Sequence, residues 1–383
     1  ADIYRRLAAA SPDAYLPNLA ASLSNLGIRL SEVGRREQAL ALAEEAADIY
    51  RRLAAASPDA YLPNLAASLS NLGIRLSELG KREQALAPTE EAVTIRRRLA
   101  EDNPDAYLPD LAASLNNLGT VLSQLGRWGH VLAPAEEATR FYRRLAAANP
   151  DAYLPNLATS LNNLGNRLSE LGRREQALAP TEEAVTIRRG LAEDNPDAYL
   201  PELAMSLNNL GIRLVELGRH EQALAPAEEA TSTYRRLAMV NPDAYLPYLA
   251  AALSNLGASR PGVGRREQVL AAVEEATRIY RRLAEVNPEA YLANLARSLW
   301  MYGFVCVNVK ANFSEALKSV TEAISLYEPL VRQLPQTFAG QLFSAYRTLA
   351  DVFDGLGRTG EAAELRRQLD EPRVDRQQRG VVP

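Results

Sequence analysis

The chain has 383 residues and carries 43 Lys+Arg against 47 Asp+Glu, which is a formal net charge of -4. This balance leaves no basic field for nucleic acid or an anionic membrane, so neither is an expected partner. Only two histidines and one cysteine are present, which argues against Cys/His metal sites, a disulfide framework and Cys/His catalytic pairs. No apolar run approaches the roughly 18 residues of a membrane span, so we expect a cytoplasmic location.

The segment Ser11-Pro-Asp-Ala-Tyr-Leu-Pro returns every 46 residues along the chain. It recurs at Ser57, Asn103, Asn149, Asn195 and Asn241, and in looser form at Asn287. Such a period predicts a stacked array, because one unit cannot cover its own apolar residues. We expect seven repeats over residues 11–333, a capping repeat over 334–370 and a disordered tail over 371–383. Residues 1–10 match the end of a repeat, so we expect them to be the trailing part of an upstream repeat in a longer protein.

Each repeat is expected to form two helices. Between residues 57 and 102, leucines spaced by four and three residues predict a helix A over about 59–79, and alanines with Ile95 predict a helix B over about 82–100. Ser57 before Pro58 is expected to cap helix A, and Gly80 to end it in a left-handed turn.

Several residues are expected to disturb or stabilise these helices. Pro63 and Pro88 predict kinks, and Pro261 predicts a break in helix A of the sixth repeat. Arg96, Arg97 and Arg98 are expected to stabilise the negative end of the helix B dipole.

The middle of the repeat reads Leu69-x-Asn71-Leu72-Gly73-x-x-Leu76, followed by Gly80, Ala85, Ala92 and Ile95. This pattern resembles the tetratricopeptide repeat, in the long-helix variety of kinesin light chains and bacterial regulatory proteins. The resemblance covers residues 1–370 and implies an all-α fold, a right-handed α-α superhelix (solenoid) of helix-turn-helix units. It also implies a concave groove, lined by helix A, that binds a peptide.

A polar stripe follows helix A on a face distinct from its leucines. Between residues 57 and 102 the stripe consists of Asn64, Ser68, Asn71 and Arg75. The resemblance implies that the asparagine at the position of Asn71 forms hydrogen bonds with the backbone of a bound peptide. It also implies that the arginine at the position of Arg75 binds a carboxylate. The candidate peptide-binding residues are Asn71, Arg75, Asn117, Asn163, Arg167, Asn209, Arg213 and Asn255.

The same residues also have structural interpretations. Arg75, Arg167 and Arg213 each stand three residues before a glutamate, which predicts ordinary pairs within the helix. The asparagines could instead cap a neighbouring helix end. Both interpretations stay open at this point.

Apolar residues interrupt the stripe near the C-terminal end. Tyr248, Trp300 and Met301 are candidate apolar anchors for a ligand, and the alternative is that they pack beneath the capping repeat. Acidic pairs such as Glu90-Glu91 are expected to be a solvated face, because adjacent helical positions do not face each other. No phosphate-binding glycine motif is present, so we expect no catalytic residue, cofactor or metal.

The sequence therefore predicts a non-enzymatic scaffold or sensor region of a larger protein, with a protein or peptide segment in the helix-A groove. The arginines suggest that the segment carries acidic groups. The alternative is a self-associating or autoinhibitory array that stacks head to tail through its end faces.

Overall fold

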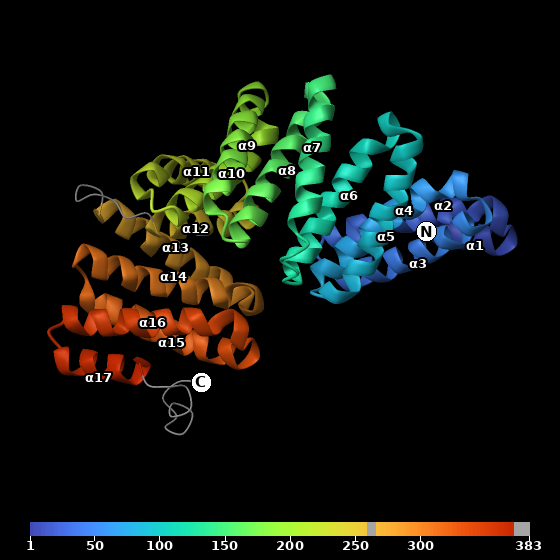
Figure 1. Cartoon of the computed structure of the whole chain (residues 1–383). Helices are drawn as coiled ribbons and strands as arrows, with labels where there is room; N and C mark the ends of the chain where they lie inside the picture. Colours follow the sequence, from blue (N-terminus) through green and yellow to red (C-terminus); the bar gives the residue numbers. More distant parts are fainter. Residues whose placement is uncertain (259–265, 371–383) are drawn as a thin grey trace. The chain divides into compact units, whose positions relative to one another are not determined.

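A computed structural model describes residues 1–258 and 266–370 of the chain (Figure 1). These residues form seventeen α-helices and no strand. The first nine helices are α1 (Asp2–Ala10), α2 (Pro12–Glu32), α3 (Arg36–Ala56), α4 (Pro58–Glu78), α5 (Arg82–Asp102), α6 (Pro104–Gln124), α7 (Leu132–Ala148), α8 (Pro150–Glu170) and α9 (Arg174–Asp194). The others are α10 (Pro196–Glu216), α11 (His220–Val240), α12 (Pro242–Ala258), α13 (Arg266–Val286), α14 (Pro288–Val309), α15 (Phe313–Gln333), α16 (Pro335–Gly355) and α17 (Thr359–Asp370).

The helices alternate as the 46-residue period predicts. The even-numbered helices from α2 to α14 are A helices, and the odd-numbered helices that follow them are B helices. Gly80 has φ +71 just beyond α4, so the predicted left-handed ending is confirmed. Both helices continue through their internal prolines, Pro63 and Pro88. The predicted break at Pro261 and the predicted tail at 371–383 lie outside the described residues.

The cap at the start of helix A depends on the repeat. Asn103 accepts a hydrogen bond on its side chain from the backbone N–H of Ala106 at 3.3 Å. The same bond, accepted from the backbone N–H three residues later, is formed by Asn149, Asn195, Asn241 and Asn287. Ser57 occupies the predicted N-cap position before Pro58, but its side chain makes no such bond. A serine hydroxyl is one bond closer to the backbone than an asparagine carbonyl, and at this geometry it does not reach.

The described helices fall into two compact units, Ala1–Ile187 and the part of the chain from Arg188 onward. In the first unit consecutive helices from α1 to α8 pack on each other, and in the second unit consecutive helices from α10 to α17 do so. Successive A helices also pack on each other, as α2–α4, α4–α6 and α6–α8 in the first unit and α10–α12, α12–α14 and α14–α16 in the second. Each unit is therefore an all-α stack of helix pairs, as the sequence predicts.

Glycine in helix A allows helix B to approach closely. A Cβ atom on Gly73 would lie 2.3 Å from Thr89 Oγ1, which itself donates to the carbonyl of Ala85 at 2.7 Å. Gly165 has the same relation to Thr181, at 2.5 Å. Gly119 differs, because a Cβ there would meet only the carbonyl of Val131, at 3.7 Å. Glycine is thus required by close packing at Gly73 and tolerated at Gly119.

Ion pairs join each B helix to the next B helix. Arg51 of α3 pairs with Glu91 of α5 at 2.8 Å, and Arg97 of α5 pairs with Glu137 of α7 at 2.6 Å. The other pairs of this arginine–glutamate ladder are Arg5–Glu45, Arg143–Glu183, Arg189–Glu229, Arg235–Glu275 and Arg281–Glu322.

The ladder changes the expected roles of these charges. The hydrogen bond from Arg97 lowers the pKa of the Glu137 carboxyl. The second glutamate of an acidic pair therefore binds the preceding repeat, whereas the prediction treated both as solvated. Arg97 likewise pairs with a neighbouring repeat, in place of the predicted dipole contact. Each pair is partly exposed and contributes at most about 1 kcal/mol.

We expect Gly73→Ala to destabilise the first unit and Gly119→Ala to leave it unchanged or slightly more stable. The clash with Thr89 should cost about 1–3 kcal/mol, partly offset by the roughly 1 kcal/mol that alanine gains over glycine within a helix. Urea denaturation followed by circular dichroism measures both variants. Equal free energies of unfolding for the two would contradict the packing role assigned to Gly73.

Candidate functional site

One side of each A helix is left uncovered by its neighbours. In α4 this side runs through Asn64, Ala67, Asn71, Ile74 and Glu78, which are exposed or half-buried. We call the surface formed by these five positions in successive repeats the helix-A face. It differs from the predicted stripe, because Ser68 is only 2% exposed and lies on the packed side. The helix-A face therefore carries fewer polar groups than the sequence suggests.

The asparagine row lies along the middle of the helix-A face. Asn71, Asn117, Asn163 and Asn209 are half-buried, and their side-chain amides form no hydrogen bond within the described chain. Asn71 and Asn117 lie on α4 and α6, which pack on each other. Each amide therefore keeps both a donor and an acceptor available for a ligand.

Asn255 is the exception in the asparagine row. Its Nδ2 donates to Asn208 Oδ1 of the preceding A helix at 2.9 Å, and its Oδ1 accepts from Arg297 Nη2 at 3.4 Å. Asn255 therefore links three successive A helices, which is a structural role.

The arginine row is engaged within its own helices. Arg75 pairs with Glu78 at 2.9 Å, Arg167 with Glu170 at 2.9 Å and Arg213 with Glu216 at 3.0 Å. Their side chains are only 9–12% exposed. Burial lowers the pKa of Arg167. A ligand carboxylate would have to compete with these glutamates, which is the structural interpretation that the sequence left open.

A pocket of about 370 Å³ opens beside Asn117. It is lined by Gly73, Ile74, Ser77, Glu78, Thr89, Asn117, Thr120, Val121 and Gln124. The pocket occurs where Val121 replaces the arginine of the row. Ser77 Oγ is buried there without a hydrogen-bond partner, whereas the equivalent Ser123 donates to Glu170 at 2.9 Å. Gln124 stands in the position of that glutamate, so the loss of the pair leaves the serine unsatisfied.

The three predicted apolar anchors lie in different surroundings. Trp300 donates from Nε1 to Thr348 Oγ1 of α16 at 2.9 Å and packs in the cluster that joins α14 to the last repeat. Met301 is half-buried in the same cluster. Tyr248 is 54% exposed and stacks on Tyr234, with ring centroids 5.6 Å apart. Only Tyr248 is thus presented openly, and the other two mainly hold the last repeat in place.

A paired position between helix B and the next helix A was not anticipated from the sequence. Asn294 donates to the hydroxyl of Tyr280, fourteen residues earlier, at 3.4 Å. In two repeats an arginine replaces the tyrosine: Arg96 donates to the carbonyl of Asp110 at 3.1 Å, and Arg188 to that of Glu202 at 2.8 Å. The signal was present in the sequence, because the exchange of tyrosine for arginine accompanies the exchange of asparagine for an acid. Arg96 is therefore a buried contact between helices, which corrects its predicted dipole role.

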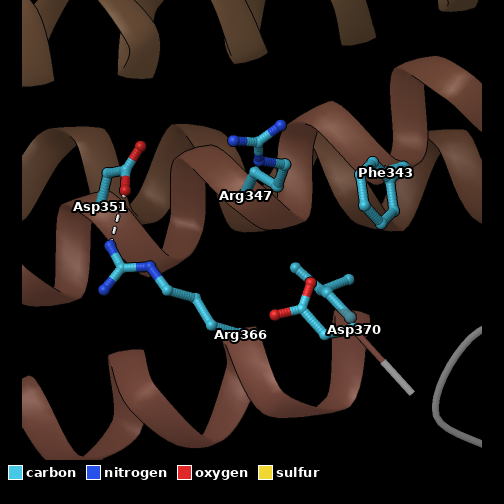
Figure 2. Close-up of a pocket in the computed structure, with 6 residues that line it drawn as sticks. Phe343, Arg347, Asp351, Arg366 and Asp370 are labelled. Atoms are coloured by element: carbon cyan, nitrogen blue, oxygen red, sulfur yellow. Dashed lines mark hydrogen bonds and ion pairs between the residues drawn. The ribbon is translucent and has the colours of Figure 1, made fainter.

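A second polar pocket, of about 290 Å³, lies between α16 and α17. Figure 2 shows Phe343, Arg347 and Asp351 along one helix and Arg366 and Asp370 on the facing one. Arg366 pairs with Asp351 at 2.7 Å and with Asp354 at 2.6 Å. These pairs fasten α17 to α16, so the pocket is a by-product of that attachment. Within residues 1–258 and 266–370, no group of acidic, histidine or cysteine side chains is arranged to hold a metal ion.

Sequence and structure comparisons find repeat proteins. The tetratricopeptide repeat profile matches residues 19–59, 65–105, 111–150, 157–197 and 203–238. The solved structure of BtubC (BKLC) from P. vanneervenii is 21% identical, with 65% of this chain and 92% of that chain covered and a TM-score of 0.50. A search of curated proteins gives no match.

Two further structures cover more of the chain. A Signal Transduction ATPase with Numerous Domains from Pyrococcus horikoshii, which has a tetratricopeptide repeat sensor, is 16% identical over 88% of this chain and 46% of its own, with a TM-score of 0.57. The apo form of RapI is 13% identical over 82% of this chain and 99% of its own, with a TM-score of 0.54. At these identities the structures show a shared fold. No described helix is long and apolar enough to cross a membrane.

We expect the chain to lose stability as the pH rises above about 10, the pKa of a tyrosine in an unfolded chain. Burial raises the pKa of Tyr50, Tyr142, Tyr234, Tyr280, Tyr302 and Tyr327, and that of Tyr346 to about 12. The folded state therefore holds more protons than the unfolded state there, so unfolding is favoured as the pH increases. Tyrosinate absorbance and circular dichroism should change together at the upper end of the titration. Full ionisation before any loss of helicity would contradict the burial of these hydroxyls.

Proposed function

This chain belongs to the tetratricopeptide repeat family, and on that premise we propose that it binds an extended protein or peptide segment along its helix-A face. In this proposal it is a non-enzymatic scaffold or sensor region of a larger protein. The sensor role is supported by the Pyrococcus horikoshii protein, whose tetratricopeptide repeats are described as a sensor.

The observation that carries the proposal is the asparagine row of the first unit. Asn71, Asn117 and Asn163 present half-buried amides, without a hydrogen-bond partner among the described residues, on A helices 46 residues apart. An amide pairs with a peptide group as both donor and acceptor. Helices packed about 8–10 Å apart would offer one such contact for roughly every three residues of extended chain.

The hydrogen bonds of the asparagine row alone do not supply enough free energy for tight binding. Each neutral hydrogen bond contributes a net free energy of about 0.5–1.5 kcal/mol, whereas association costs roughly 4–15 kcal/mol. The pocket beside Asn117, of about 370 Å³, is available for an anchoring side chain. Acidic groups on the segment receive less support than the sequence suggested, because Arg75 and Arg167 are already paired with glutamates.

The test compares Asn71→Ala/Asn117→Ala/Asn163→Ala with a control triple, Glu90→Ala/Glu136→Ala/Glu182→Ala. The control residues are exposed on B helices of the same unit. A partner captured from lysate by the wild-type chain supplies the segment, whose affinity is then measured by calorimetry. Loss of three hydrogen bonds should weaken binding by roughly 10- to 1,000-fold, and the control should not change it. Equal affinity for both triples, with unchanged melting, would reject the helix-A face as the binding surface.

A further inference from the structure

The helix-A face of the second unit departs from the repeat at three neighbouring positions. Glu202 and Tyr248 stand where Asn64, Asn156 and Asn294 stand in other repeats. Met205 stands where four repeats have alanine, at Ala21, Ala67, Ala113 and Ala251. Most of the surrounding positions repeat closely, so these side chains are not needed to stack one repeat on the next. Their proximity in the fold indicates a specialised surface.

The departures form one pocket of about 170 Å³. It is lined by Pro201, Glu202, Met205, Tyr234, Tyr245 and Tyr248. Where Asn294 donates to Tyr280 in another repeat, Tyr248 instead stacks on Tyr234, with an angle of 18° between the rings. The pocket therefore has an aromatic wall, and Met205 at 37% exposure keeps it open to solvent.

The pocket also contains a carboxylate with an unused oxygen. Glu202 Oε2 is buried and accepts no hydrogen bond. Arg188 donates from Nη1 to the main-chain oxygen of Glu202 and to Ser206 Oγ, at 2.8 Å each. A carboxylate held away from water without a donor is unfavourable, so a cation that enters the pocket beside Glu202 gains electrostatic energy, which the Arg188 guanidinium behind Glu202 partly offsets.

We propose that this pocket binds an alkylammonium group, the end of a lysine side chain on a protein segment that lies along the helix-A face of the second unit. Tyrosine ring faces attract a cation, methylenes suit the aromatic wall, and Glu202 supplies the opposite charge. An anion would be repelled by Glu202, and an aliphatic side chain would gain nothing from its charge. The source of the lysine rests on the proposed function, but the pocket itself can be tested without any segment.

The test uses the full chain labelled with ¹³C at its methionine methyl groups. The chain has three methionines, so three resonances are expected, and Met205→Leu identifies the one in the pocket. The probes are N-acetyl-lysine methylamide, its ε-trimethyl form and the uncharged norleucine analogue. Both cationic probes should shift the Met205 resonance with dissociation constants of about 1 mM. The ratio of the two dissociation constants shows whether the pocket prefers unmodified or trimethylated lysine. Met239, which is 75% exposed and outside the pocket lining, should not shift.

Variants separate the charge from the aromatic wall. Glu202→Gln should weaken the cationic probes about tenfold and leave the norleucine analogue unchanged. Tyr248→Asn, which restores the residue of other repeats, should weaken the cationic probes by a similar factor. Asp197→Asn removes an exposed charge from the first turn of the same helix and should change nothing.

Binding of the norleucine analogue as tightly as the lysine probe would overturn the proposal, as would a Met205 resonance that does not move at tens of millimolar probe. Loss of segment binding along the asparagine row leaves the Met205 response untouched, so failure of the proposed function is recognised separately. Circular dichroism of each variant confirms that the fold is retained.

Discussion

The leucine at the centre of each A helix is the contact on which the stack depends. Leu23, Leu69, Leu115, Leu161, Leu207, Leu253 and Leu299 are all under 2% exposed and lie 46 residues apart. Burying one such side chain contributes about 1.5–3 kcal/mol, and a single helix pair cannot enclose it. Stability within each unit is therefore shared between neighbours. The arginine–glutamate ladder serves this stacking, and the close approach at Gly73 packs helix A on helix B within one repeat.

The fold was predictable because its determinants repeat. Leucine spacing, Pro58 and Gly80 recur in register, so the pattern predicts the same two helices many times over. The N-cap position of Ser57 was also predictable, but the missing capping bond of its side chain was not, because that bond depends on a side-chain reach that differs by one covalent bond between serine and asparagine. The fate of Arg75 was left open for a related reason, since a glutamate three residues later and a ligand carboxylate suit it equally.

The binding candidates were less predictable, because their environment depends on residues distant in sequence. Asn255 shares its position with Asn71, yet its amide is used by Asn208 and Arg297. Trp300 occupies an apparently open position and is engaged by Thr348, 48 residues later. In such an array the residues that recur in every repeat mainly serve the packing of the helices. The departures, such as Val121 and Tyr248, mark where the packing is relaxed and a surface becomes distinct.

The arginine–glutamate ladder has a mechanical consequence. It joins B helices through partly exposed charges, whereas the A helices touch through side-chain packing and hydrogen bonds such as that from Ser123 to Glu170. Dissolved ions screen exposed charges and leave apolar contacts largely intact. The contacts on the B-helix side of a unit therefore depend more on ionic strength than those on the A-helix side. We therefore expect the contacts between B helices to weaken with ionic strength before those between A helices do.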